Sequence, residues 1–123
     1  MPAPVRVYLA WFLTLLTLTT SQEQEAVRVA LAGELDLSSA LTFDDELRRI
    51  EEDAEAPTLV LDLGELKFMD STGLRLIVSA HQRAVRAGRR LAIVHASNAV
   101  RRIFRLTGML DRLNVVDDSR TTV

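Results

Sequence analysis

The hydrophobic pattern of the chain centres on residues 58–78, where an apolar run gives way to a helical pattern. Residues 59–63 are apolar except for one aspartate and are followed by Gly64. Such a run is typical of a strand that is buried on both faces. A short loop ending in Asp70 and Ser71 should join this strand to a helix. The apolar positions that predict the helix by their spacing are Leu74, Ile77, Val78 and Val85.

The rest of the chain alternates between short apolar runs and amphipathic segments. Alternating apolar and polar residues predict strands over residues 16–20 and 26–32, joined by a polar turn over 21–25. Short apolar runs predict two later strands, over residues 91–94 and 113–116.

Three helices are expected between the strands. The first begins after Ser38 or Ser39, either of which could cap it, and it ends before Pro57. The second covers about residues 71–87, and Gly88 is its C-terminal signal. The third follows a cap at Ser97 or Asn98, and its apolar side consists of Val100, Ile103, Phe104 and Leu106.

The element order is therefore β-β-α-β-α-β-α-β. This order predicts a single α/β domain with a mixed, largely parallel sheet, an antiparallel N-terminal hairpin and amphipathic helices packed on the sheet. Functional residues of open sheets of this type tend to lie at the carboxyl ends of the strands. In this chain that edge comprises residues 33–39, 64–71 and 95–98.

The composition is that of an ordinary globular domain. The chain has 123 residues, of which 48% are hydrophobic and 26% are charged, and a net charge of −2. These values fit one domain, and the balanced charge gives no indication of direct nucleic-acid binding. The absence of cysteine excludes disulfides and thiolate chemistry and is consistent with a cytoplasmic protein. Two histidines are too few for a typical histidine-rich metal site, and no motif calls for a cofactor.

The N-terminal segment stands apart from the predicted domain. Residues 5–18 are apolar except for one arginine and two threonines, but they are fewer than the ~20 residues of a membrane-spanning helix. A single positive charge and the lack of a small-residue cleavage site do not fit a signal peptide. We interpret residues 1–15 as an extension that forms an extra strand or packs on the domain or on a partner; weak membrane contact and dimerisation are the alternatives. The domain should cover residues 16–117, and residues 118–123 should form a flexible tail.

The junction before the second helix singles out Ser71. A helix leaves its first N–H groups without intrahelical partners, so a hydroxyl at this place can cap it. A phosphate on the same hydroxyl would meet the favourable end of the helix dipole. Position alone therefore allows either a structural cap or a phosphorylation site.

Three motifs resemble those of the STAS-domain anti-sigma factor antagonists. They are Gly33-Glu34-Leu35-Asp36, Phe68-Met69-Asp70-Ser71-Thr72-Gly73-Leu74 and Arg101-Arg102-Ile103-Phe104-x-Leu106-Thr107-Gly108-Met109-Leu110. The similarity extends from about Leu16 to Val116. Residues 1–15 have no counterpart in that family.

The resemblance implies a switch that is not an enzyme. Proteins of that family bind an anti-sigma factor that is also a serine kinase, and this releases the sigma factor. The kinase phosphorylates the antagonist, which then dissociates, and a serine phosphatase restores it. Ser71 matches the phosphoacceptor, with its neighbour Thr72 as the alternative, and Asp36 matches an acid close to the phosphosite. The expected partner-binding residues are Asp36, Leu37, Ser38, Asp70, Ser71, Thr72, Gly73 and Arg75.

Alternatives from other classes are open at this point. Asp36 and Asp70 could form a catalytic carboxylate pair, and His95, at a strand end, could approach Ser71. The sequence lacks, however, both the Gly-x-Ser-x-Gly pattern of hydrolases and the glycine patterns of nucleotide-binding loops. The same fold could also serve as a STAS subunit of a membrane-associated lipid or anion transport complex, or of a stress-signalling complex.

Overall fold

Six strands and three helices make up the computed structural model, which describes residues 6–10 and 16–116. Residues 1–5 and 11–15 of the N-terminal segment, and the predicted tail, lie outside the described residues. The elements in chain order are β1 (Arg6–Ala10), β2 (Leu16–Glu23), β3 (Ala26–Leu35), α1 (Ala40–Asp53), β4 (Thr58–Met69), α2 (Ser71–Arg86), β5 (Arg90–Val94), α3 (Asn98–Leu106) and β6 (Asn114–Val115).

The strands form one sheet in the order β1-β2-β3-β4-β5-β6. The pairs β1–β2 and β2–β3 are antiparallel, whereas the three later pairs are parallel. The predicted α/β domain with a mixed sheet and an antiparallel N-terminal hairpin is thus confirmed. β1 is a strand beyond the five predicted ones, so residues 6–10 follow the extra-strand interpretation. β2 runs to Glu23, and the turn of the β2–β3 hairpin is Gln24 and Glu25 rather than residues 21–25.

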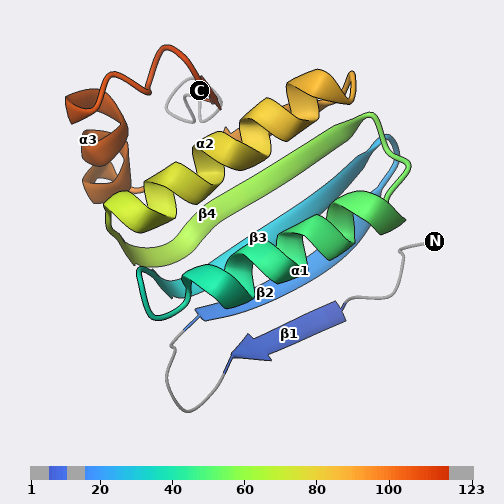
Figure 1. The fold of residues 1–123 in the computed structure, drawn as a ribbon, viewed down its shortest axis with the longest axis horizontal. Helices are drawn as coiled ribbons and strands as arrows, with labels where there is room; N and C mark the ends of the chain where they lie inside the picture. The colour runs from blue at the N-terminus through green and yellow to red at the C-terminus, as the bar shows by residue number, and fades with distance from the viewer. Residues whose placement is uncertain (1–5, 11–15, 117–123) are drawn as a thin grey trace, which may run out of the picture.

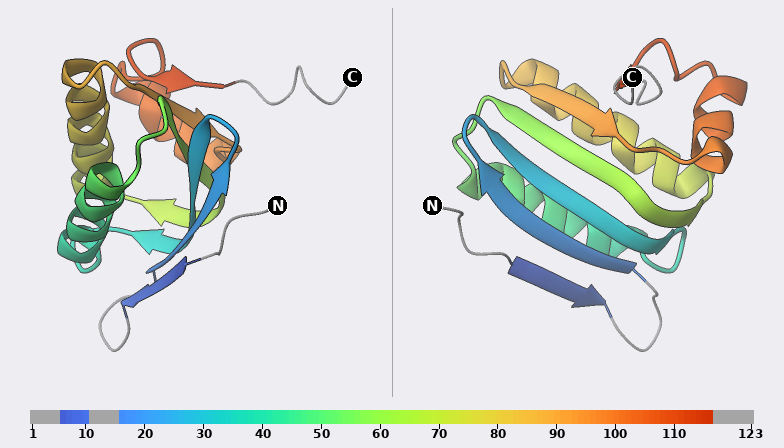
Figure 2. Two further views of the ribbon diagram at one scale, coloured as in Figure 1. Left: turned by 90° about the vertical axis from the view of Figure 1, so that its right-hand side faces the viewer. Right: turned by 180° about the vertical axis from the view of Figure 1, so that it is seen from behind.

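α1 and α2 lie on one face of the sheet (Figure 1; Figure 2, left). The parallel strands follow one another in the same direction across the sheet, so right-handed crossovers place both helices on the same side. α3 lies at the end of the sheet where β4 leads into α2, and it contacts β4 (Figure 1). The view from behind shows the opposite face of the strands, with α1 and α2 behind them (Figure 2, right). No helix within residues 16–116 is long and apolar enough to cross a membrane.

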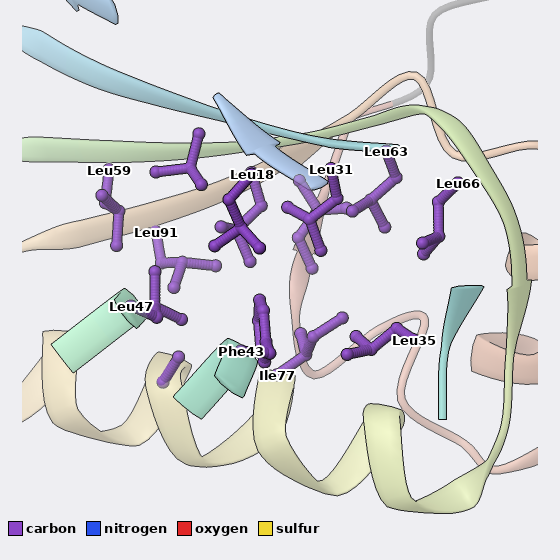
Figure 3. Close-up of a cluster of buried hydrophobic side chains, with 14 of the residues drawn as sticks. Leu18, Leu31, Leu35, Phe43, Leu47, Leu59, Leu63, Leu66, Ile77 and Leu91 are labelled. Carbon is purple, nitrogen blue, oxygen red and sulfur yellow. The ribbon is translucent and has the colours of Figure 1, made fainter. Parts of the chain in front are cut away.

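The hydrophobic core lies between the sheet and the helices α1 and α2 (Figure 3). Burial alternates along β4: Leu59, Leu61 and Leu63 are buried, whereas Val60 and Asp62 are half-buried. The prediction that this strand is buried on both faces was therefore wrong. The reason is that α1 and α2 cover one face of the sheet only.

Two helix positions predicted to face the core are exposed instead. Val85 of α2 and Leu106 of α3 have 61% and 73% of their surface accessible. In α2, Ala84 rather than Val85 continues the buried stripe, and Leu106 is the last residue of α3. Both predictions failed in the last turn of a helix, where a shift of one residue rotates the side chain by about 100°.

β3 and β4 run farther than the sequence indicated, and this changes the approach to Ser71. β3 continues through Gly33 to Leu35, with a φ of 108° at the glycine and a register shift beside it. A glycine tolerates this positive φ without strain, and an added residue of this kind bends a strand without ending it. β4 continues through Gly64 to Met69. The expected loop before Ser71 is therefore the single residue Asp70.

Candidate functional site

The candidate site lies where β3 and β4 end side by side. The Asp70 N–H donates to the Leu35 carbonyl at 3.2 Å, so the last residues of the two strands are joined. The Asp70 carboxylate then accepts two backbone hydrogen bonds, from the Gly73 N–H to Oδ1 at 3.0 Å and from the Leu37 N–H to Oδ2 at 3.3 Å. Asp70 therefore caps α2 and at the same time fixes the turn after β3.

Ser71 occupies the first residue of α2 and is exposed. Because Asp70 is the cap, the structural-cap interpretation of Ser71 was wrong: its side chain makes no hydrogen bond to another described residue. The hydroxyl therefore lies at the positive end of the helix dipole and is not committed to holding the fold. Thr72, the alternative acceptor, is half-buried, and Arg75 one turn later is exposed.

Gly73 allows the start of α2 to lie directly on the end of β3. A Cβ atom at this position would lie 2.7 Å from the Leu35 carbonyl oxygen, 2.8 Å from Leu35 Cγ and 2.9 Å from Met69 Cγ. Distances this short do not occur between real Cβ atoms and their neighbours. Glycine is therefore required for close approach rather than for an unusual backbone angle, and it sets the position of Ser71 two residues earlier.

The turn after β3 is organised around the Asp36 carboxylate. Asp36 Oδ1 accepts from the Ser38 hydroxyl at 2.7 Å, from the Ser38 N–H at 3.0 Å and from the Ser39 N–H at 3.3 Å. These bonds, the one from the Ser38 hydroxyl foremost, lower the pKa of the Asp36 carboxyl below its ordinary value. The Asp36 carboxylate therefore binds donors of its own turn, and the Asp70 carboxylate binds two backbone amides. The two carboxylates do not bind each other, so they are not arranged as a catalytic pair that exchanges a proton.

Ser39 has a different role from the predicted cap. It holds the N-cap position of α1, but its side chain makes no capping hydrogen bond. Its hydroxyl is fully buried, donates to the Glu34 carbonyl at 2.9 Å and accepts from the Asp36 N–H at 3.0 Å. Ser39 therefore ties the turn back to the end of β3.

His95 lies elsewhere along the edge. A Cβ on Gly64 would lie 3.4 Å from His95 Cβ, which places this histidine beside Gly64, six residues before Asp70 on β4. At about 3.3 Å per residue, those six residues correspond to about 20 Å of strand. The structure does not bring together the serine, histidine and acid that a hydrolase would need.

The segments that meet at this edge of the sheet carry exposed apolar side chains. Leu37 and Leu41 are 76% and 79% exposed, and Phe68 is 50% exposed. They come from the turn after β3, the first turn of α1 and the end of β4 respectively. We call Leu37, Leu41 and Phe68 the apolar rim. Among residues 16–116, the other exposed large hydrophobic residues are only Val85 and Leu106.

A comparison with known protein families identifies the family of the chain that carries this site. The family model described as the STAS domain matches residues 17–121. The chain belongs to the STAS domain family. A curated relative, the anti-sigma-B factor antagonist of Bacillus subtilis (strain 168), is 29% identical over 94 residues, which cover 76% of this chain and 84% of the relative.

Solved structures share the fold of this STAS domain. An anti-sigma factor antagonist from Mycobacterium paratuberculosis matches with a TM-score of 0.74 at 24% identity, over 88% of this chain and 93% of that one. The anti-sigma factor antagonist SpoIIAA of Bacillus matches in its unphosphorylated form with a TM-score of 0.69 at 19% identity, over 85% of this chain and 92% of that one. Its phosphorylated form matches with a TM-score of 0.60 at 17% identity, over 97% and 96%. The STAS-like fold predicted from the sequence is confirmed.

Two residues of the apolar rim of this STAS domain, Leu41 and Phe68, were not among the residues predicted from the sequence. A signal for Leu41 was available, because it falls outside the helical stripe formed by Ala40, Phe43 and Leu47. Phe68 could not be placed while the strand was expected to end near residue 63. β4 in fact reaches Met69, which is buried, so the neighbouring Phe68 must point to the opposite face of the sheet.

Proposed function

We propose that this STAS domain is an anti-sigma factor antagonist that is switched by phosphorylation of Ser71. In the unphosphorylated state it binds an anti-sigma factor with serine kinase activity, and the sigma factor is released. The kinase then phosphorylates Ser71, the complex dissociates, and a serine phosphatase reverses the modification. The domain acts as a binding module rather than as an enzyme, and it needs no cofactor.

The observation that carries the proposal is the free, exposed hydroxyl of Ser71 at the start of a rigidly held helix. Asp70 already caps α2, so a kinase can take the hydroxyl without removing a structural hydrogen bond. Leu37 and Leu41 of the apolar rim offer exposed apolar area to a partner at the same edge of the sheet. The similarity to the anti-sigma-B factor antagonist adds support. So does SpoIIAA of Bacillus, an anti-sigma factor antagonist of the same fold that has been solved in a phosphorylated form.

The physical basis of the switch is a change in charge rather than a change in shape. A phosphate adds roughly −1.5 to −2 charges at neutral pH. The N-terminal end of α2 stabilises part of this charge, so the fold should accept it. A partner surface fitted to a neutral hydroxyl and an apolar rim would have to bury the charge without a counter-ion, which costs several kcal/mol. Since each 1.4 kcal/mol is about tenfold in affinity, one phosphate can weaken binding by about 100-fold to 1,000-fold.

The test is calorimetric titration of the full chain with the serine-kinase anti-sigma factors encoded in the same genome. Ser71→Ala should bind like the wild type and should not be phosphorylated when ATP is added. Ser71→Asp should bind at least about tenfold more weakly, because it places a permanent charge in the interface. Thr72→Ala should still be phosphorylated, which separates the two candidate acceptors.

Gln22→Glu is the matched control for charge. Gln22 is exposed at the end of β2, on the opposite edge of the sheet from Ser71. The substitution adds the same single charge and should leave the affinity unchanged. Equal affinities for the wild type and Ser71→Asp, or an equal loss in Gln22→Glu and Ser71→Asp, would contradict the proposed switch.

The other role considered from the sequence is a subunit of a membrane-associated transport complex or of a stress-signalling complex. It is not favoured, because the matching curated relative is named as an antagonist. The free Ser71 hydroxyl and the adjoining apolar rim are explained directly by regulated binding to one protein partner.

A further inference from the structure

A pocket of about 550 Å³ lies between the outer side of α2 and the segment that follows α3. Its lining includes Val78, His81, Val85, Arg86, Met109 and Arg112. His81 is ten residues beyond Ser71 in α2, about 15 Å along the axis at 1.5 Å per residue. The pocket is therefore separate from the proposed switch, and its volume lies within the range of small-molecule sites.

Both walls of the pocket are fixed by the fold. Val78, His81 and Val85 are spaced three and four residues apart, so they share one face of α2, beside the face that packs on the sheet. The opposite wall is a turn held to the end of α3. In this turn the Met109 N–H donates to the Phe104 carbonyl at 2.8 Å, and the Leu113 N–H donates to the Met109 carbonyl at 2.9 Å. A ligand would thus meet a formed site and would not have to order it.

The chemistry of the lining combines apolar walls with cationic groups. Val78, Val85 and Met109 supply the apolar surface. Arg86 and Arg112 are exposed arginines, and neither forms an ion pair with another residue in 16–116. No acidic side chain is among the described residues of the lining. The field in the pocket therefore favours an anion, and a guanidinium matches the two oxygens of a carboxylate.

His81 contributes to the pocket wall with its ring rather than with its Nδ1 atom. His81 Nδ1 is buried and has no hydrogen-bond partner among the described residues. Because this nitrogen has no accessible surface, it does not face the open pocket. The carboxylate of a ligand would therefore meet the exposed guanidinium groups of Arg86 and Arg112, while its apolar body covers Val78 and Val85.

We propose that this pocket binds a small amphipathic carboxylate, such as a free medium-chain fatty acid, with the carboxylate at Arg86 and Arg112 and the apolar chain along α2. The site does not depend on the proposed function of Ser71. The proposed ligand would cover Val85, a large apolar residue that is exposed and lies outside the apolar rim.

The test is an NMR titration of the ¹⁵N-labelled full chain with sodium decanoate. Saturable shifts should be confined to residues 78–86 and 109–113, with a dissociation constant below about 1 mM for a ligand of this size. Arg112→Gln and Arg86→Gln should each weaken binding by about tenfold, the usual effect of removing one charge-assisted hydrogen bond. Both arginines are exposed, so the variants should retain the wild-type spectrum elsewhere.

Two controls test whether decanoate binding depends on the position of the arginines and on the charge of the ligand. Arg102→Gln removes an exposed arginine of α3 that does not line the pocket, and its affinity for decanoate should equal that of the wild type. Decyltrimethylammonium has the same chain with the opposite charge and should bind at least about tenfold more weakly than decanoate. The proposal is overturned if decanoate gives no saturable shifts, if the shifts lie elsewhere, if Arg102→Gln weakens binding as much as Arg112→Gln, or if the cation binds as well as the anion.

Discussion

The two ends of α2 are attached to the rest of the domain by different forces. At the N-terminal end, Asp70 accepts from two backbone amides and Gly73 brings the helix within contact of Leu35. At the C-terminal end, the attachment is ionic. Arg83 Nε and Nη2 each donate to the Glu51 carboxylate of α1 at 2.7 Å, and this bidentate pair raises the pKa of Arg83 above its ordinary value.

Arg89 extends this ionic attachment just beyond the helix. Its guanidinium donates to the carbonyl of Glu51 at 2.9 Å and to the carbonyl of Ala54. Glu51 lies in the last turn of α1 and Ala54 is its C-cap residue, and carbonyls at a helix C-terminus have no intrahelical partner. The charged groups between α1 and α2 therefore largely satisfy one another or the backbone.

The difference shows how a fold can keep a reactive group available. At the ionic end, the side chains on the side of α2 that faces α1 are committed to the Glu51 carboxylate or to the backbone of α1. At the N-terminal end, backbone groups and close packing hold the helix, and the Ser71 side chain takes no part. A modification of Ser71 can therefore change what binds to the surface without weakening the fold.

Gly73→Val tests the close packing and should have the largest effect. The new Cβ would lie 2.7 Å from a backbone oxygen, and neither the strand nor the helix can move away easily. We expect a loss of about 3 kcal/mol or more in the free energy of unfolding, the upper range for overpacking. Urea unfolding monitored by circular dichroism would measure it.

Gly64→Val is the control for Gly73→Val. A Cβ on Gly64 would approach Asp62 Oδ1, at the end of a side chain, at 3.1 Å and His95 Cβ at 3.4 Å, and Gly64 lies in a strand, where valine is favoured. The loss there should stay below about 1 kcal/mol. Equal losses in the two variants would show that α2 does not depend on close approach at its N-terminal end.

Arg83→Ala tests the ionic end. The Arg83 and Glu51 side chains are only 15% and 16% exposed, so removal of the arginine leaves a largely buried carboxylate without its partner. We expect a loss of about 2 kcal/mol in the free energy of unfolding and no change in affinity for the proposed anti-sigma factor partner. A double-mutant cycle with Glu51→Ala should show a favourable coupling energy between the two residues.

The comparison variant for the ionic end is Arg48→Ala. Arg48 pairs with Asp44 one turn earlier in α1, and its side chain is 52% exposed. Exposed pairs of this kind contribute about 0.5 kcal/mol or less. If Arg83→Ala cost no more than Arg48→Ala, the ionic attachment of α2 would have to be abandoned.

The sequence predicted the order of elements because each strand and helix buries one side, and that side recurs with a fixed period. It could not predict where β3 and β4 end. Gly33 and Gly64 each looked like a strand terminus, but pairing of Leu35 with Met69 continues both strands past their glycines. Pairing between distant strands is tertiary, and a local pattern does not contain it.

The prediction of the role of Ser71 was limited by a similar ambiguity. Aspartate and serine are both good caps, so Asp70-Ser71 leaves the first residue of the helix uncertain by one position. In the structure Asp70 is the cap, which leaves the Ser71 hydroxyl free. The apolar rim could be predicted only in part for another reason. Whether Leu41 and Phe68 are exposed depends on which other elements cover their faces of α1 and β4.

Asp70→Ala tests the polar clamp at the N-terminal end of α2. It removes the cap at Gly73 and also the bond to the Leu37 N–H. The expected loss is about 1.5 kcal/mol, within the range for a removed cap. Hydrogen exchange should accelerate at the Leu37 amide, which is otherwise protected by the carboxylate.

Ser97→Ala is the matched cap removal in α3, where Ser97 Oγ accepts from the Val100 N–H at 3.2 Å. It should cost about 1 kcal/mol and leave exchange at Leu37 unchanged. If Asp70→Ala also left exchange at Leu37 unchanged, Asp70 would not hold the turn after β3.

Asp36→Asn should have the smallest effect, and the effect should depend on pH. The hydrogen bonds from Ser38 lower the pKa of Asp36 in the folded chain, so its ionised form contributes stability above the unfolded-state pKa of about 3.9. This contribution is lost as the pH falls through the lower, folded-state pKa. Urea midpoints of the wild type and Asp36→Asn should therefore differ at pH 7 and converge as the pH approaches 2.

Ser38→Ala removes the strongest donor to the Asp36 carboxylate, and an NMR titration should show the pKa of Asp36 returning toward its ordinary value. A gap between the midpoints that is the same at both pH values, or an unchanged Asp36 titration in Ser38→Ala, would mean that this turn is not held by its carboxylate.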